Sequence, residues 1–313
     1  MATSPDNNVE EIDESVFRIR AMLSQETSVY TLQSNYLLNA SVFATSRRRS
    51  RPGSPVTPPV DASCRVLMAK WCNSLCDFCK YDRDVTAAAM SCVDRFASTP
   101  SGMETILMDR DRYQLAVMTG LYLIAKIQQG EALDPESVAK LSRGKHSKAD
   151  IENMEMEMLV RLQWRVHPPT PWTFARELLN LIPTSVAMEE ATRERIYELT
   201  KYQLEVAVLD YDLSFRRSSE LAFGAILNAM ESLSVDFAVP FETSVSQLLK
   251  TEVHQLRDIR MGLLKVISED ASVQPMCAVL TQRTSVMASY HAPKNDSFSC
   301  VSSSPKSVSA TIQ

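Results

Sequence analysis

The sequence has 313 residues, of which 45% are hydrophobic and 23% are charged, a composition typical of a soluble globular protein with one large or two ordinary domains. Only 7 residues are glycine, and neither G-x-x-x-x-G-K-S/T nor G-x-G-x-x-G occurs, which disfavours P-loop NTPases, dinucleotide-binding enzymes and protein kinases. The formal net charge of −5 disfavours a constitutive nucleic-acid-binding protein, so we expect no nucleic-acid partner.

Neither a signal peptide nor a membrane span is predicted. Residues 1–6 are polar, and the most apolar stretch, 116–125, is shorter than the roughly 18 residues that a span requires. The 7 cysteines are odd in number, and those between Cys64 and Cys79 lie too close together for a disulfide framework. We therefore expect a protein of a reducing, intracellular compartment that does not bind membranes.

The first elements in chain order are a short helix and a linker. Within 11–43, four apolar residues have helical spacing and predict a helix that packs on the body: Ile12, Val16, Ile19 and Leu23. Residues 45–60 are rich in serine, proline and arginine and cannot form a core. Residues 1–59 are thus predicted to be a partly disordered extension.

Residues 60–167 contain five predicted helices. The helical period of the apolar residues predicts helices over 61–81, 85–96 and 111–128, the last apolar on nearly every side. A fourth begins at Pro135 after an Asp134 cap and ends before Gly144. A fifth runs from a Ser147–Asp150 capping box to Leu162. These helices predict one bundle.

A second bundle is predicted after the prolines at 168, 169 and 171, which indicate a hinge. Its predicted helices cover 170–181, 186–209, 216–233, 241–250 and 251–268. The expected fold is therefore all-α, with two five-helix bundles in tandem over 60–167 and 168–270. Flexible N- and C-terminal tails flank them, and residues 271–313 form a disordered tail rich in serine and threonine.

Several segments resemble, in order and spacing, motifs of the cyclin family. The motifs M-R-A-I-L-x-x-W, D-R-F, L-Q-L…L-L-A-x-K, M-E and P-T-P have counterparts at 64–71, 94–96, 113–126, 154–155 and 169–171. Lys201-Tyr202 and residues 209–212 are similar to the second fold of that family, so the resemblance covers about 60–270. Cys64, Ser74 and the pair Gln128-Gln129 depart from the family pattern, which indicates a divergent cyclin similar to the A-, B- and D-type cell-cycle cyclins.

The resemblance implies a non-catalytic regulatory subunit that binds and activates a cyclin-dependent protein kinase and controls cell-cycle progression. Such a subunit would work in the nucleus, the cytoplasm or both, without catalytic residues, cofactors or a metal. The resemblance also implies that Lys126, Ile127 and Glu155 face the kinase. The Lys–Glu pair would hydrogen-bond backbone groups of the kinase's mobile helix and activation segment.

The resemblance further implies an exposed docking patch for substrates or inhibitors that carry Arg-x-Leu. Its residues here would be Arg65, Leu67, Met68, Trp71, Tyr113 and Gln114. The acidic residue that pairs with the ligand's arginine is replaced by Ser74, with Asp77 one turn later as a substitute. The alternative is that these residues only bury a helix against the bundle.

Two other function classes stay open. One is a helical scaffold or transcription-factor-like protein of the transcription factor IIB type, with the same double fold and no kinase. The more remote is an iron–sulfur radical S-adenosylmethionine enzyme, because Cys72, Cys76 and Cys79 form a C-x3-C-x2-C pattern. Those thiols share one face of a predicted helix, however, where cysteine usually packs as a small apolar residue.

Low-complexity segments carry two more candidate features. Serine or threonine followed by proline, the minimal preference of the implied kinase, marks three candidate phosphorylation sites: Ser54, Thr57 and Ser304. The basic run from Arg47 to Arg51 is a candidate nuclear-import signal, although such runs are more often only solvated.

Overall fold

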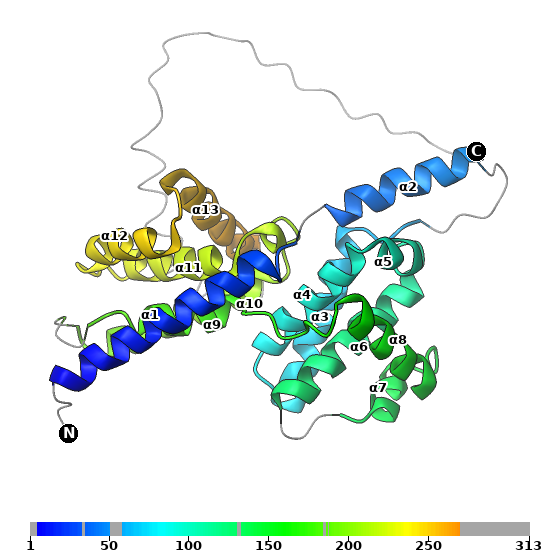
Figure 1. Cartoon of the computed structure of the whole chain (residues 1–313), viewed down its shortest axis with the longest axis horizontal. Coiled ribbons are helices and arrows are strands. Elements are labelled where there is room, and N and C mark those ends of the chain that lie inside the picture. Colours follow the sequence, from blue (N-terminus) through cyan, green and yellow to red (C-terminus); the bar gives the residue numbers. More distant parts are fainter. Residues whose placement is uncertain are drawn as a thin grey trace, which may run out of the picture.

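The computed structural model describes residues 5–32, 35–50, 58–129, 133–183, 186 and 188–269. Within these ranges the chain forms 13 α-helices and one 3-10 helix, with no β-strand (Figure 1). The candidate phosphorylation sites Ser54, Thr57 and Ser304 lie outside the described residues, as does the predicted tail over 271–313. None of the helices in the described ranges is long and apolar enough to cross a membrane.

The first bundle contains the five helices predicted for it. They are α3 (Ala62–Cys79), α4 (Asp84–Ala97), α6 (Arg110–Gln128), α7 (Pro135–Leu141) and α8 (Lys148–Arg161). A sixth, short helix, α5 (Pro100–Thr105), was not predicted. It is one and a half turns long, too short for a helical period, although Thr99 caps it and Pro100 starts it.

Helix α6 is the centre of this bundle because its neighbours α3, α4, α7 and α8 surround it. All but one of residues 113–125 are buried. At Gly120 the backbones approach closely, since a Cβ there would lie 2.9 Å from Cγ2 of Val93 in α4. The prediction of a helix apolar on nearly every side is confirmed.

The second bundle also has the five helices predicted for it. They are α9 (Pro171–Leu179), α10 (Glu190–Ala207), α11 (Ser218–Ser232), α12 (Ala238–Leu249) and α13 (Val253–Glu269), with the 3-10 helix η1 (Leu213–Phe215) before α11. Helix α11 packs against the other four and is buried over 219–230. The predicted all-α fold of two five-helix bundles is therefore confirmed.

Two N-terminal helices attach to different bundles, and Figure 1 shows α1 running along the second bundle while α2 lies beside the first. Helix α1 (Pro5–Ser28) packs against α9 and buries Ile19 in the second core. Helix α2 (Tyr36–Ser50) buries Tyr36 and Ala40 in the first core.

The predicted linker over 45–60 begins too early. Helix α2 continues to Ser50, because no proline or glycine interrupts the chain before Pro52 and Ala44 is buried one turn after Ala40.

Candidate functional site

Lys126 and Glu155 form an ion pair between two helices of the first bundle. Lys126 lies in the last turn of α6, and Glu155 lies in the middle of α8. The buried side chains of Ile151, Met154 and Met158 fix the face that α8 turns toward α6. As a result, Nζ of Lys126 lies 2.5 Å from Oε1 of Glu155 although 29 residues separate them.

The pair holds its cation at the protein surface. The Lys126 side chain is 49% exposed and that of Glu155 is 13% exposed. The hydrogen bond to Glu155 raises the pKa of Lys126, and Nζ also lies 5.2 Å from the ring centre of Tyr122. A position near the carboxyl end of α6 favours a cation further. An ammonium group has three donors, so hydrogen atoms remain for acceptors on a partner.

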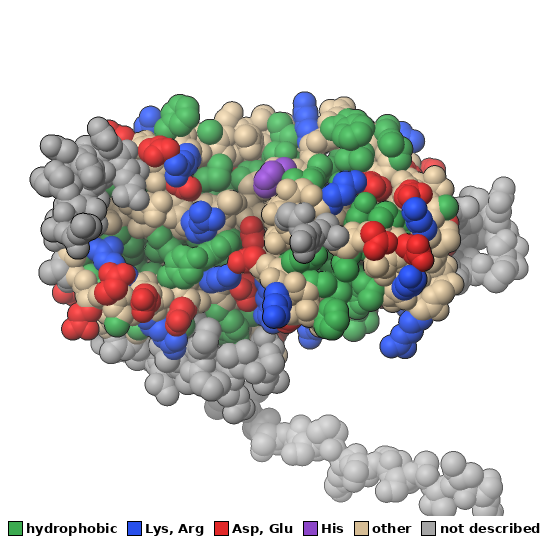
Figure 2. All heavy atoms as spheres, turned by 90° about the horizontal axis from the view of Figure 1, so that it is seen from below, with side chains coloured by type: hydrophobic (Ala, Val, Ile, Leu, Met, Phe, Trp, Pro, Cys, Tyr) green, Lys and Arg blue, Asp and Glu red, His purple; other side chains and the backbone are tan. Residues whose placement is uncertain are grey.

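Exposed apolar side chains lie on the same two chain segments as this pair. Ile127, next to Lys126, is 43% exposed, and Trp164, just after α8, is 65% exposed. Met156 and Val160 are exposed at i and i+4 on α8. On the face shown in Figure 2, hydrophobic, basic and acidic side chains are interspersed, and no single charge sign dominates.

The turn after α8 has an unusual backbone that the sequence did not indicate. Gln163 and Trp164 are consecutive left-handed residues with φ of 53° and 61°. Each such non-glycine residue costs roughly 1–2 kcal/mol. The N–H groups of Gln163 and Trp164 donate to the carbonyl oxygens of Val160 at 3.1 Å and of Leu159 at 2.8 Å, the two bonds of a common helix cap with a left-handed residue at the position of Gln163. The cap does not require a second left-handed residue, and because Trp164 is mostly exposed, core packing does not account for its conformation.

Two residues of the expected docking patch are not on the surface, which corrects the prediction. Arg65 is 2% exposed, and its Nη2 lies 2.8 Å from Oδ2 of Asp94 while Nη1 donates to the carbonyl oxygen of Val208 at 2.8 Å. Tyr113 is 1% exposed. A guanidinium needs paired acceptors when it is buried, and Asp94 and Val208 supply them at the junction of the two bundles.

Without Arg65 and Tyr113, the predicted docking patch is smaller than expected, and it lacks an unpaired acidic group. Leu67 is exposed, whereas Met68, Trp71 and Gln114 are partly buried. Asp77 cannot readily replace the missing acid at Ser74, because it accepts two hydrogen bonds of 2.8 Å from Arg83. These bonds also lower the pKa of Asp77.

The three cysteines of the C-x3-C-x2-C pattern pack along α3. Cys72 and Cys76 are fully buried, and Sγ of Cys76 lies 3.4 Å from Oγ1 of Thr86. Burial raises the pKa of Cys72, Cys76 and Cys79, whereas metal ligation requires thiolates. Among the described residues no group of three or more His, Cys, Asp or Glu side chains is arranged for a metal ion. The packing interpretation of these cysteines accounts for the geometry.

Polar contacts join the two bundles at a seam. Lys201 of α10 contacts Asp82 at 2.7 Å, and Arg83 contacts Glu205 at 3.3 Å. The hydroxyl group of Thr170 donates to Asp84 at 2.8 Å.

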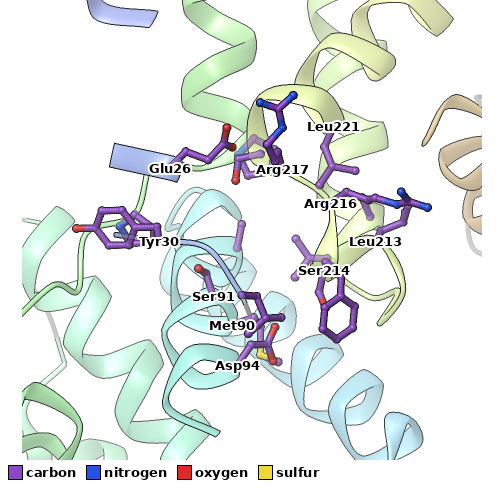
Figure 3. Close-up of a pocket in the computed structure, with 18 of the residues that line it drawn as sticks. Glu26, Tyr30, Met90, Ser91, Asp94, Leu213, Ser214, Arg216, Arg217 and Leu221 are labelled. Atoms are coloured by element: carbon purple, nitrogen blue, oxygen red, sulfur yellow. The ribbon is translucent and has the colours of Figure 1, made fainter. Parts of the chain in front are cut away.

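A cavity of about 130 Å³ lies beside this seam. Figure 3 shows that it is lined by side chains from α1, α4 and the segment around η1, including Glu26, Ser91 and Ser214. These residues are far apart in the sequence, and no local pattern predicts that they meet.

Two models of known protein domains match the sequence. One, described as "Cyclin, N-terminal domain", covers residues 29–167, and the other, "Cyclin, C-terminal domain", covers residues 169–307. G1/S-specific cyclin-D1 of Mus musculus is 23% identical over 175 residues, which are 55% of each chain. Cyclin-A3-2 of Oryza sativa subsp. japonica is 23% identical over 279 residues, 88% of this chain and 65% of that relative.

The fold has a counterpart among solved structures. The X-ray structure of a viral cyclin from herpesvirus saimiri superposes with a TM-score of 0.54 at 15% identity, covering 74% of this chain and 96% of the viral one. The match to the cyclin-D1 sequences spans about half of their length, 55% in the mouse protein. At 15% identity, the likeness to the viral cyclin shows a shared fold only. The matches to the two domain models extend across both bundles.

Proposed function

Because this chain belongs to the cyclin family, we propose that it is a non-catalytic regulatory subunit that binds and activates a cyclin-dependent protein kinase and thereby controls cell-cycle progression. The observation that carries the proposal is the surface ion pair of Lys126 and Glu155. The kinase supplies the active site and its cofactors, and this chain supplies a binding surface. We also propose that the complex works in the nucleus, the cytoplasm or both, which imaging of the tagged full chain tests.

The geometry of the pair suits the stabilisation of one kinase conformation. A cation and an anion 2.5 Å apart offer donors and acceptors in a fixed arrangement. A kinase helix that moves into its active position leaves backbone carbonyl and amide groups that need partners, and the pair satisfies them. The exposed side chains of Ile127 and Trp164 add apolar area. Activation follows from a higher affinity for the active conformation than for the inactive one.

We propose a reduced docking patch on α3 for substrates or inhibitors with Arg-x-Leu. Leu67 and Trp71 would contact the leucine of the peptide, whereas its arginine would lack the usual carboxylate. Replacing the peptide's leucine by alanine should therefore lower its affinity more than replacing its arginine. Equal losses for the two peptides, measured by fluorescence anisotropy, would argue against this patch.

The test of kinase binding is capture from native lysate with the tagged full chain. A kinase that phosphorylates histone should co-purify with the wild type and be lost with Lys126→Ala/Glu155→Ala. Truncating a desolvated interfacial charge pair costs roughly 2–5 kcal/mol, about 30-fold or more in affinity. The matched control is Arg195→Ala/Glu198→Ala, an exposed ion pair on the second bundle.

Both double variants should keep the helical circular dichroism and the melting temperature of the wild type. A double variant at 126 and 155 that still captures the kinase refutes the site. If no kinase co-purifies with the wild type, the alternative of a helical scaffold without a kinase is favoured.

A further inference from the structure

The cap that ends α8 does not explain the left-handed backbone of Trp164. Gln163 occupies the usual left-handed position of such a cap, whereas Trp164, the next residue, is left-handed as well and is 65% exposed. Strained residues persist only where their surroundings determine the conformation, and they gather at functional sites. The turn also follows α8, the helix that carries Glu155.

Helix α4 holds the chain directly after Trp164. The Nη2 group of Arg95 donates to the carbonyl oxygen of Arg165 at 2.5 Å. The thiol of Cys92 donates to the carbonyl oxygen of Val166 at 3.4 Å. Because both donors come from buried side chains of one helix, residues 164–166 are fixed relative to the core of the first bundle.

Arg95 is a buried cation that lies against an aromatic ring. It is 8% exposed, and among the described residues it forms no ion pair and its Nε has no hydrogen-bond partner. Its guanidinium carbon lies 4.7 Å from the ring centre of Tyr30, so the ring face stabilises the cation in place of a carboxylate. Tyr30 thus keeps Arg95 in the position from which it holds the turn.

Tyr30 belongs to the segment that leaves helix α1. Glu26, at the end of that helix, accepts hydrogen bonds from the backbone N–H of Ser219 at 2.9 Å and from its hydroxyl group at 2.6 Å. Figure 3 shows that Glu26 and Tyr30 both line the cavity between the bundles. The anchored end of α1 therefore sets where the Tyr30 ring lies.

We infer that Arg95 and Tyr30 are positioning residues: together they hold the exposed Trp164 in the orientation that the partner kinase binds. This inference rests on the proposed function, and it adds that the N-terminal helix supports the kinase-facing turn although the family models begin only at residue 29. Neither residue contacts the kinase in this scheme. Their effect on affinity passes through the turn.

The test combines hydrogen exchange of the free protein with kinase affinity. In Tyr30→Leu, which removes the aromatic face, amide exchange over 163–166 should rise and affinity for the captured kinase should fall about tenfold. Tyr30→Phe keeps the ring and should restore both values. The control Tyr197→Leu removes a half-exposed ring from the second bundle and should change neither value.

Two variants of Arg95 extend the series. Arg95→Met removes the charge and the donor to Arg165. If Arg95→Met does not fold, Arg95→Lys, which keeps the charge, takes its place. Unchanged exchange over 163–166 in Tyr30→Leu would overturn the positioning role. Raised exchange with unchanged affinity would overturn the role of the turn in binding. If the wild type binds no kinase, the proposed function fails, yet the exchange data still decide whether Tyr30 and Arg95 hold the turn.

Discussion

Arg65 is a buried cation at the junction of the two bundles. It lies on α3 and is 2% exposed, in contrast to the surface position expected for it. The acceptors that draw it inward, Asp94 and Val208, lie 29 and 143 residues away in the chain. The side chain of Tyr36 also donates to Asp94, at 2.6 Å. Such a set of partners exists only once both bundles are assembled.

Removing the charge of Arg65 should destabilise the protein strongly. In Arg65→Ala the carboxylate of Asp94 stays buried without its cation, which typically costs about 3–5 kcal/mol. Lys70→Ala, at an exposed position of the same helix, should change the free energy of unfolding by no more than about 0.5 kcal/mol. Urea denaturation of the two variants checks this. A loss below about 1 kcal/mol for Arg65→Ala would contradict the structural role assigned to the pair.

Asp84 makes stability depend on pH at the seam between the bundles. Burial raises the pKa of its carboxyl group to about 6, although the hydrogen bond from Thr170 opposes the shift. Among the charged neighbours, Asp82 raises this pKa, and Lys201 and Arg176 lower it. The folded state therefore holds the proton more tightly than the unfolded state, whose aspartate titrates near 3.8. The stabilising contribution is complete below about pH 4 and is lost as the pH rises through about 6.

The variant Asp84→Asn, which imitates the protonated carboxyl group, isolates this effect. Relative to the variant, the wild type should lose roughly 2–3 kcal/mol of unfolding free energy between pH 4 and pH 7. Urea unfolding of both proteins across that range measures the difference. A difference that does not vary with pH would show that Asp84 keeps an ordinary pKa in the folded protein.

At the level of single helices, the sequence predicted the first residue well where a neighbouring side chain caps the helix. Asp134 accepts hydrogen bonds from the N–H groups of Glu136 and Ser137, and the capping box of Ser147 and Asp150 is present. The start of α11 differs, because its own N-cap residue, Arg217, provides no side-chain hydrogen bond. The cap comes instead from Glu26 of α1, which no sequence window around α11 contains.

The capping role of Glu26 predicts how α1 is attached. In Glu26→Ala, α11 loses its cap and α1 loses its anchor, so the protein should lose about 1–2 kcal/mol of stability. Amide exchange should rise over 12–30 and near 219, and stay unchanged in α6. Glu14→Ala, which removes an exposed carboxylate elsewhere on α1, is the matched control. Equal exchange in the two variants would mean that apolar contacts such as those of Ile19 alone hold the helix.

At the scale of the whole molecule, the two bundles were predictable because each has a central apolar helix and prolines divide them. The family resemblance alone implied that Lys126 and Glu155 share a surface, and in the structure the two side chains lie 2.5 Å apart. The seam, the support of Trp164 and the burial of Arg65 and Tyr113 were not predictable. They depend on contacts between segments that no periodicity relates.

Activation of a purified cyclin-dependent kinase by the purified full chain tests the proposed regulatory role. Histone phosphorylation should rise from the level of the kinase alone when the wild type or the Arg195→Ala/Glu198→Ala control is added. It should stay at that level with Lys126→Ala/Glu155→Ala at equal concentration and with an unchanged melting temperature. Equal activation by the double variant at 126 and 155 would show that the ion pair is not the activating surface, and no activation of any such kinase by the wild type would refute the regulatory role.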